Sequence, residues 1–210
     1  GNPWLNYSVY LNNVLLPGIL QLIILMFTVS AFGSEIKAGN GPKLMSMGDN
    51  SIIKVMIGKL LPYTIIYMGI ALLFMAVLYY INRFPLHNGF WPMFFNYACL
   101  ILAAQGAGII LLGIFRNYRF ALSIASLIGM VSFSITGFSF STLAMDGSLS
   151  ALSNLFPLRH FFLIYVDQAL NGIAVGYSMY HYAALLGFVL LSIFFFGTVR
   201  KLLKDNVYEL

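Results

Sequence analysis

The sequence predicts an all-α, polytopic membrane protein with five transmembrane helices. Of its 210 residues, 60% are hydrophobic and only 8% are charged, whereas soluble domains carry roughly 25% charged residues. The apolar residues lie in long runs, and a helix that crosses ~30 Å of hydrocarbon needs ~20 of them. The basic residues lie singly between these runs, so the net charge of +5 reflects membrane topology and predicts no nucleic-acid partner.

Five apolar runs are long enough to cross a bilayer as helices, and together they form a single domain over residues 1–210. The first run has Pro17 in its first helical turn, where proline is tolerated. A short basic turn, Arg116–Arg119, separates the third run from the fourth. The predicted spans cover residues 14–32, 60–81, 92–115, 120–140 and 183–199.

The segment 33–59, between the first two spans, has a different character. Charged residues lie here among glycines and a proline, and Asp49–Ser51 is a typical helix-start signal. Apolar residues then recur at helical spacing from Ile52 to Leu60. We therefore expect an amphipathic helix that lies on the membrane surface.

The segment 141–182 is too polar for a plain span and too apolar for an ordinary loop. Helix start signals at Ser153-Asn154 and Pro157, and a stop signal at Asn171-Gly172, surround an apolar stretch. We expect a helix from Phe156 to Gly172 that enters the outer face of the bilayer, or lies along it, without crossing.

The distribution of basic residues predicts the orientation. Segment 33–59 has four, the turn 116–119 has two and the tail after residue 199 has three, against only Arg83 and Arg159 on the other side. Because basic loops stay in the cytoplasm, the tail is predicted inside and the start of the chain outside. Five spans with an outside start require an upstream span or a cleaved signal, so the chain is expected to be a piece, or a processed product, of a longer polypeptide.

Two of the predicted spans carry polar faces. Gln21 and Thr28 are seven residues apart in the first span, and hydroxyl residues that include Ser132 and Thr136 recur in the fourth. Small and hydroxylated residues let membrane helices pack closely and hydrogen-bond to each other. The same residues are also suited to the wall of a substrate path, and both interpretations stay open here.

Few residues are suited to catalysis or metal binding. His87, His160 and His181 lack metal-ligand spacing, and a single cysteine, Cys99, excludes a cysteine cluster, so no metal site is predicted. No phosphate-binding glycine loop occurs, so the chain is not expected to hydrolyse nucleotide. His160 and Asp167 are two helical turns apart, ~10.5 Å along the axis, which is too far for a direct acid–base dyad.

Several separated motifs, in this order along the chain, match one family. The first are Asn2-Pro3 with Leu16-Pro17-Gly18, Glu35-x-x-x-Gly39, and Gly58-Lys59-Leu60-Leu61-Pro62-Tyr63. The others are Thr136-Gly137-Phe138-Ser139-Phe140 and Phe156-Pro157-Leu158-Arg159-His160-Phe161, which closes at Gly172. On these motifs the chain resembles the ABC-2 type permeases, the membrane subunits of ATP-driven exporters, and in particular their bacterial drug-efflux branch. Asn40, Thr136, Ser141 and Asp146 depart from the usual family pattern.

The resemblance implies roles for three groups of residues. Segment 33–59 would be the cytoplasmic coupling region that docks on an ATPase, with coupling residues Glu35, Lys37, Gly39, Lys43, Gly58 and Lys59. Region 141–182 would be an outer re-entrant helical region, with an outer gate formed by Phe156, Pro157, His160 and Asp167. The substrate path would be lined by Gln21, Thr28, Ser132 and Thr136.

The resemblance also implies partners and a location. The partners would be an ABC ATPase subunit that binds ATP and Mg, a second permease copy in a homo- or heterodimer, and the lipid bilayer, with a periplasmic adaptor protein as a further candidate. This chain would bind no cofactor and would not be an enzyme. It would be a multi-pass protein of the bacterial inner membrane with a cytoplasmic C-terminus, and it would lack the first transmembrane helix and external domain of its family.

Two other functional classes stay open as alternatives. An intramembrane enzyme would use His160 and Asp167 as acid and base, but such groups must lie within ~2.6–3.2 Å of the proton that they move. An ion-coupled secondary transporter would place ionisable groups inside its spans, and the five predicted spans lack Asp, Glu, Lys and Arg between their ends. The sequence does not identify the cargo, since drugs, lipids, glycolipids and hydrophobic peptides all suit an apolar path with hydroxyl groups.

Overall fold

The computed structural model describes residues 7–136 and 151–205. Within these ranges every regular element is a helix, and five helices are long and apolar enough to cross a membrane. This confirms the predicted all-α polytopic fold. The five are α1 (Tyr7–Lys37), α3 (Ile52–Met75), α4 (Phe90–Phe115), α5 (Tyr118–Ile135) and α8 (Met179–Asp205).

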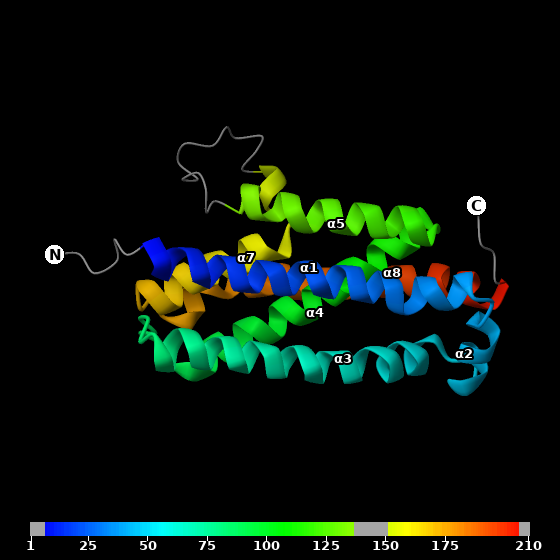
Figure 1. Ribbon diagram of the computed structural model, residues 1–210, viewed down its shortest axis with the longest axis horizontal. Coiled ribbons are helices and arrows are strands. Elements are labelled where there is room, and N and C mark those ends of the chain that lie inside the picture. The colour runs from blue at the N-terminus through cyan, green and yellow to red at the C-terminus, as the bar shows by residue number, and fades with distance from the viewer. Residues whose placement is uncertain (1–6, 137–150, 206–210) are drawn as a thin grey trace.

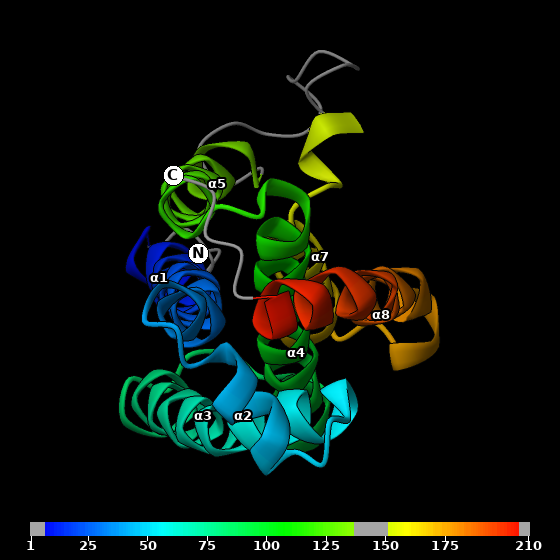
Figure 2. The ribbon, with the colours of Figure 1, turned by 90° about the vertical axis from the view of Figure 1, so that its right-hand side faces the viewer.

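Helix α4 forms the centre of the bundle (Figure 2). Helix α1 packs against α4 and lies between α5 and α3, while α8 packs along another side of α4. In the most apolar stretch of α4 67% of the residues are buried, whereas the corresponding stretches of α3, α5 and α8 are each 22% buried. Helix α4 is therefore the core helix, and α3, α5 and α8 present apolar faces outward. Gly106 lets α4 and α8 approach closely, because an added Cβ would lie 2.8 Å from the carbonyl oxygen of Phe188.

Shorter helices connect the long ones (Figure 1). Helix α2 (Gly41–Met47) links α1 to α3, and a π-helical turn, η2 (Ala76–Ile81), continues α3. Helix α7 (Pro157–Tyr165) is followed by a second π-helical turn, η4 (Val166–Leu170), and a 3-10 turn, η5 (Val175–Ser178), leads into α8. Apart from Leu163, every residue of α7 is buried, so α7 is packed inside the bundle.

The helices extend beyond the predicted spans. Helix α1 covers Tyr7–Lys37 instead of 14–32, so Pro17 lies inside the helix and not in its first turn. The helix ends just before Gly39, whose φ of +75° turns the chain. Helix α8 covers Met179–Asp205 instead of 183–199, because Leu202 and Leu203 are buried and hold the basic tail in a helix. Helices α4 and α5 each begin two residues before the predicted starts at 92 and 120.

The expected surface helix after Asp49–Ser51 is wrong as a separate element. Residues 52–59 instead form the first turns of α3, which continues through Pro62 into the predicted second span. A proline ring inside a helix presses on the carbonyl four residues earlier. That residue is Gly58, and α3 continues through the proline as one helix.

The re-entrant region is described only in part, because residues 137–150 lie outside the described ranges, as do the last residues of the predicted fourth span. The expected helix from Phe156 to Gly172 is present as α7 followed by η4. Phe156 has the extended backbone typical of a residue that caps a helix, and Pro157 occupies the first helical turn.

Two large apolar clusters lie toward the two ends of the bundle, and a smaller third cluster, which includes Cys99 and Tyr182, joins α4, α7 and α8. The cluster at the α7 end contains Tyr97, Phe161 and Tyr165, and the cluster at the α2 end contains Met45 and Leu203. Buried side chains of α2 and of the end of α8 belong to the second cluster. Both elements are therefore anchored in the core, and their polar residues are held at one end of the bundle.

Candidate functional site

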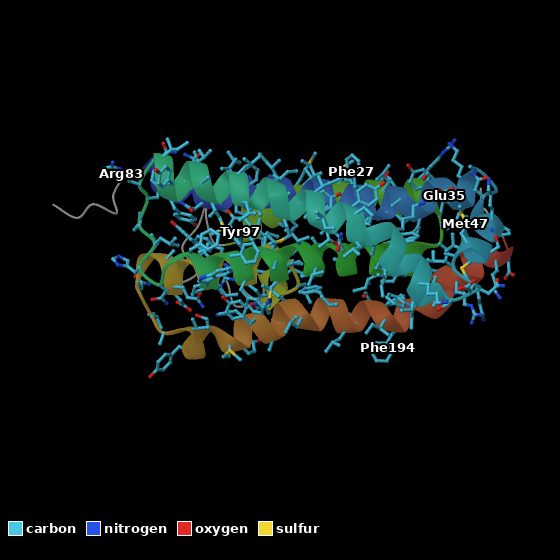
Figure 3. The ribbon with its side chains drawn as sticks, turned by 90° about the horizontal axis from the view of Figure 1, so that it is seen from below. Phe27, Glu35, Met47, Arg83, Tyr97 and Phe194 are labelled. Carbon is cyan, nitrogen blue, oxygen red and sulfur yellow. The ribbon has the colours of Figure 1, made fainter. Side chains whose placement is uncertain are left out.

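One end of the bundle gathers most of the basic residues. Helices α1, α4 and α8 end there, α3 and α5 begin there, and α2 lies across it (Figures 1 and 2). Glu35 and Met47 mark this end in Figure 3, whereas Arg83 lies at the opposite end. The basic residues of this end, which we call the basic end, are Lys37, Lys43, Lys54, Lys59, Arg116, Arg119, Arg200, Lys201 and Lys204.

An ion pair joins α1 to α3 at the basic end. Nζ of Lys59 lies 2.6 Å from Oε1 of Glu35, and the two side chains are 16% and 30% exposed. The same ammonium lies 5.9 Å from the ring centroid of Phe32, within range of a cation–π contact. Two of the predicted coupling residues are thus bound to each other, and they close the α1–α2–α3 turn.

The other predicted coupling residues are accessible. Lys37, Gly39, Lys43 and Gly58 are all exposed, and the left-handed backbone of Gly39 directs the chain from α1 into α2. Their side chains and backbone form the outer surface of the α1–α2–α3 turn. This surface is polar and solvent-accessible, as expected for a reversible protein interface.

The turn between α2 and α3 is held by polar contacts of its own. Asp49 and Asn50 both have positive φ values, and Lys54 places its Nζ 2.6 Å from Oδ2 of Asp49. Arg200, near the end of α8, donates from Nη2 to the carbonyl oxygen of Asn50 at 3.2 Å. A displacement of α2 would therefore be transmitted to α3 and α8 together.

Three of the four predicted path residues, Gln21, Thr28 and Ser132, lie in the packing contacts of α1. Nε2 of Gln21 donates to Oγ of Ser132 at 3.2 Å across the contact between α1 and α5. Thr136 donates to the carbonyl oxygen of Ser132. Thr28 instead packs against Gly108 of α4. All four side chains are buried, and we call the contact of Gln21, Ser132 and Thr136 the polar seam.

The polar seam is incompletely satisfied. Oε1 of Gln21 is buried and has no hydrogen-bond partner among the described residues. Two glycine contacts hold α1 and α5 close together near the seam. Gly18 of α1 packs against Phe133 of α5, and Gly129 of α5 packs against Leu22 of α1. Leaving a buried polar atom unpaired is unfavourable, so this is a place where a polar molecule, or a change in helix packing, would restore a hydrogen bond.

Helix α7 contacts both the end of α5 and α8. Arg159 is buried, and its Nη1 donates to the carbonyl oxygen of Thr136 at 2.8 Å. His160 contacts α8, since its Nδ1 lies 3.3 Å from Nδ1 of His181. Its Nε2 lies 2.9 Å from the carbonyl oxygen of Asn154. Because that carbonyl only accepts, Nε2 carries the proton and Nδ1 of His160 accepts from His181.

The predicted outer-gate residues are therefore not joined as an acid–base dyad. Asp167 accepts a hydrogen bond from Oγ of Ser178 at 3.1 Å, while His160 pairs with His181. Burial is the main cause that lowers the pKa of the His160 imidazole. The hydrogen bond to the Asn154 carbonyl opposes this effect, and the nearby His181 and Arg159 lower the pKa further. His160 is thus maintained as a neutral hydrogen-bonding group between α7 and α8.

Sequence reasoning missed several polar pairs between helices, of which two join elements of the candidate sites. His181 is 21 residues from His160, and Oε1 of Gln105 in α4 accepts from Oγ1 of Thr64 in α3 at 3.0 Å across 41 residues. The available signal was a polar residue inside an otherwise apolar run, as Gln105 is. Within residues 7–136 and 151–205, no group of three or more His, Cys, Asp or Glu side chains could hold a metal ion.

Comparison with known proteins identifies the family. A family model described as ABC-2 family transporter protein matches residues 2–199. No curated protein and no solved structure matches the chain. The match covers all five candidate spans up to the last turns of α8, and this family is a membrane component of transport, not a catalyst. The chain is therefore a multi-pass membrane protein that belongs to the ABC-2 transporter family.

Proposed function

We propose that the chain is the permease subunit of an ATP-driven exporter and that its basic end docks on a separate ATPase subunit. The observation that carries this proposal is the α1–α2–α3 turn, in which the Glu35–Lys59 ion pair lies beneath an exposed polar surface. A displacement of this surface is transmitted through α2 into α1, α3 and α8. ATP and Mg would bind to the partner subunit, and this chain would hydrolyse no nucleotide.

A cysteine cross-linking experiment tests the docking surface. The permease is co-expressed with a candidate ABC ATPase from the same organism, and single cysteines are placed at Lys43, on the basic end, or at Arg83, at the opposite end. The native Cys99 is buried and serves as the background. We expect a maleimide–diazirine cross-linker, which needs a cysteine on the permease only, to join Lys43→Cys, and not Arg83→Cys, to the ATPase. Equal cross-linking from both positions would contradict the proposal.

We also propose that a second copy of the permease covers the outer face of α1. Four apolar side chains spaced four residues apart are exposed along this helix, namely Leu15, Ile19, Ile23 and Phe27. Two such copies would place their α1 helices, and the polar seam behind them, beside a shared path. Gln21, Thr28, Ser132 and Thr136 would face that path when the contacts of α1 with α5 and α4 loosen, in a two-state movement.

Disulfide cross-linking within membranes tests the dimer. Ile23→Cys should form a disulfide-linked dimer under mild oxidation, whereas Ile65→Cys, an even more exposed position on α3, should stay monomeric. The proposed location is the bacterial inner membrane with the basic end in the cytoplasm, because basic loops stay on that side. A membrane-impermeant reagent applied to intact cells should therefore label Arg83→Cys and leave Lys43→Cys unmodified.

A further inference from the structure

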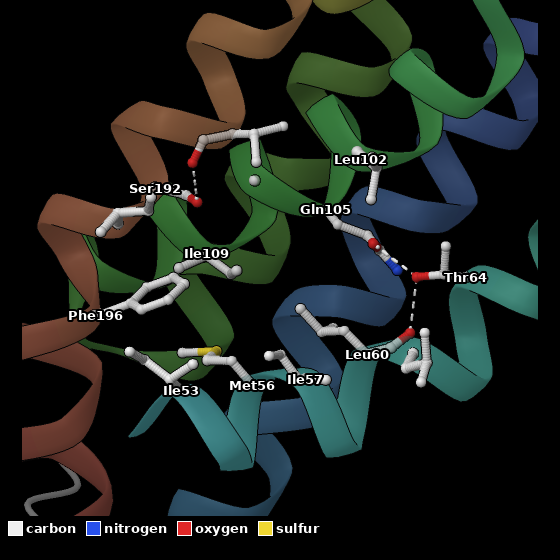
Figure 4. A pocket seen from close by; sticks show the side chains of 14 residues that line it. Ile53, Met56, Ile57, Leu60, Thr64, Leu102, Gln105, Ile109, Ser192 and Phe196 are labelled. Atoms are coloured by element: carbon white, nitrogen blue, oxygen red, sulfur yellow. Dashed lines mark hydrogen bonds between the residues drawn. The ribbon is translucent and has the colours of Figure 1, made fainter. Parts of the chain in front are cut away.

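A cavity of about 340 Å³ lies between α3, α4 and α8 (Figure 4). Neither α1 nor α5 contributes to its lining, so the cavity is separate from the polar seam and from the proposed path. Its volume falls within the ~300–1,000 Å³ that is typical of small-molecule sites. The residues that line it include Ile57, Leu60, Thr64, Gln105, Ser192 and Phe196.

The lining excludes a charged ligand. None of the residues that form the cavity wall is acidic or basic, and most are aliphatic or aromatic. Although Lys54 and Lys59 belong to the same helix, α3, neither lines the cavity. A charge placed here would lose its hydration without gaining a partner, so the cavity is suited to an uncharged molecule.

One polar group in the wall lacks a partner. Gln105 is 4% exposed, and its Nε2 has no hydrogen-bond partner among the described residues. Its Oε1 accepts from Thr64, whose hydroxyl also lies 2.9 Å from the carbonyl oxygen of Leu60. If the amide turned toward the cavity about its last side-chain bond, a soft torsion, Thr64 would keep its bond to Leu60. The amide would then donate to an acceptor on a bound molecule.

The depth of Gln105 argues against a phospholipid. Gln105 lies ten residues before the end of α4 at Phe115, a distance of ~15 Å along the helix. That depth is close to the middle of a hydrocarbon layer ~30 Å thick, whereas the ester oxygens of phospholipids lie at its boundary. An acyl chain at this depth offers no acceptor, so it would leave the amide unpaired.

From these observations we propose that the cavity binds an uncharged, apolar small molecule that carries a carbonyl or ether oxygen, and that the molecule reaches it from the lipid phase. Gln105 donates to that oxygen, and the aliphatic and aromatic wall encloses the rest. The site requires neither ATPase coupling nor a second copy of the chain. Binding is therefore measurable on the isolated permease and stands or falls separately from the proposed transport function.

Benzophenone is a suitable probe because it is an uncharged diaryl ketone that both accepts a hydrogen bond and photolabels nearby C–H bonds. The permease in phosphatidylcholine nanodiscs is irradiated with benzophenone, and the labelled residues are mapped by mass spectrometry. We expect labelling to concentrate on the cavity wall and to saturate. Ile57→Trp, at a position that is 57% exposed and lines the cavity, should reduce labelling at least tenfold.

Ile65→Trp is the matched control, since Ile65 is 63% exposed on the same helix and does not line the cavity. It should label like the wild type. Gln105→Leu should lower the apparent affinity for benzophenone about fivefold, the effect of one typical hydrogen bond. Diphenylmethane, which has the same shape without the carbonyl, should compete equally well for the wild type and for Gln105→Leu. Size-exclusion chromatography establishes that each variant is folded.

Three results would overturn the proposal. Labelling could spread evenly over the exposed apolar surface without saturating, as expected for partition into lipid. The two tryptophan variants could label alike. A phosphatidylglycerol with a photoreactive acyl chain could displace benzophenone from the cavity, and the groove would then be a phospholipid site.

Discussion

Glu35 and Lys59 are 24 residues apart in the chain, and their charged groups lie 2.6 Å from each other. Glu35 lies in the last turns of α1, and Lys59 lies in the first half of α3. The pair therefore fixes the distance between two long helices at the place where α2 connects them. Any force applied to α2 acts on a turn whose base is held by an ion pair, and so it moves both helices.

The first prediction concerns the stability that this pair contributes. Glu35→Gln should lower the free energy of unfolding by about 1 kcal/mol, because the pair is partly buried and Lys59 would lose its counter-charge. Unfolding of the purified permease in mixed micelles by increasing SDS measures the change. Glu35→Gln combined with Lys59→Met should recover part of the loss, since no unpaired charge remains.

The neighbouring pair of Asp49 and Lys54 provides the matched control. Its charged atoms are also 2.6 Å apart, but its side chains are 77% and 62% exposed. Solvent screens such a pair, so Asp49→Asn should change the free energy of unfolding by less than about 0.5 kcal/mol. Equal effects at Glu35 and Asp49 would contradict a structural role for the Glu35–Lys59 pair.

The second prediction concerns the contact between α2 and α8. An added Cβ at Gly41 would overlap the backbone carbonyl of Leu203, and a backbone atom cannot turn aside as a flexible side chain can. Gly41→Ala should therefore destabilise the protein by about 1–3 kcal/mol. In contrast, Gly58→Ala meets open space inside α3 and should stabilise the helix by about 0.5–1 kcal/mol. Thermal unfolding followed by light scattering ranks the two variants against wild type.

Some helix ends are set by residues that are close together in the sequence, and these ends could be predicted from it. The basic turn at Arg116–Arg119 is present, with α4 ending at Phe115 and the Asn117 side chain capping α5 through the backbone N–H groups of Arg119 and Phe120. Pro157 likewise begins α7 as predicted. Capping and proline geometry act over a few residues, so both can be inferred from the chain alone.

Contacts between helices could not be inferred in the same way. The pairing of His160 with His181 and that of Thr64 with Gln105 depend on how each helix is rotated about its axis. In membrane helices that are apolar on every side, periodicity does not specify this rotation. For the same reason the sequence suggested polar faces on α1 and α5 but not that Gln21 would bind Ser132 across them.

The third prediction concerns the effect of pH on the contact between α7 and α8. The groups that face His160 are His181 and Tyr180 of α8, together with Arg159 of its own helix and, through His181, Asp167 of η4. Since the pKa of His160 is lowered in the folded state, the unfolded state binds more protons as pH falls below ~6.5. Stability should therefore decrease from pH 7 toward pH 5.

Replacement of His160 isolates this effect. His160→Gln should flatten the dependence of the unfolding midpoint on pH between 5 and 7, because Gln retains hydrogen-bonding capacity and does not titrate. His87→Gln, which changes an exposed histidine, should leave the slope as in wild type. The protection of the α7 backbone against hydrogen exchange, measured relative to the intrinsic exchange rate at each pH, should decrease at pH 5 in wild type only. An unchanged slope in His160→Gln would assign the pH dependence to another group.

The last prediction separates packing from transport at the polar seam. Gln21→Leu with Ser132→Ala replaces both partners of a buried hydrogen bond by apolar groups and removes the unpaired Oε1 of Gln21. Such a double replacement is nearly neutral or stabilising for the fold. If the seam also borders the path, export by the assembled complex should fall several-fold while the unfolding midpoint is unchanged.

Asn96→Leu is the matched control, because Asn96 is an equally buried amide in α4 that donates to the carbonyl oxygen of Phe161. It should reduce stability by about 1–3 kcal/mol, since that carbonyl loses its donor, and leave export per folded complex unchanged. If export changes only in proportion to stability in both variants, then Gln21 and Ser132 serve helix packing alone.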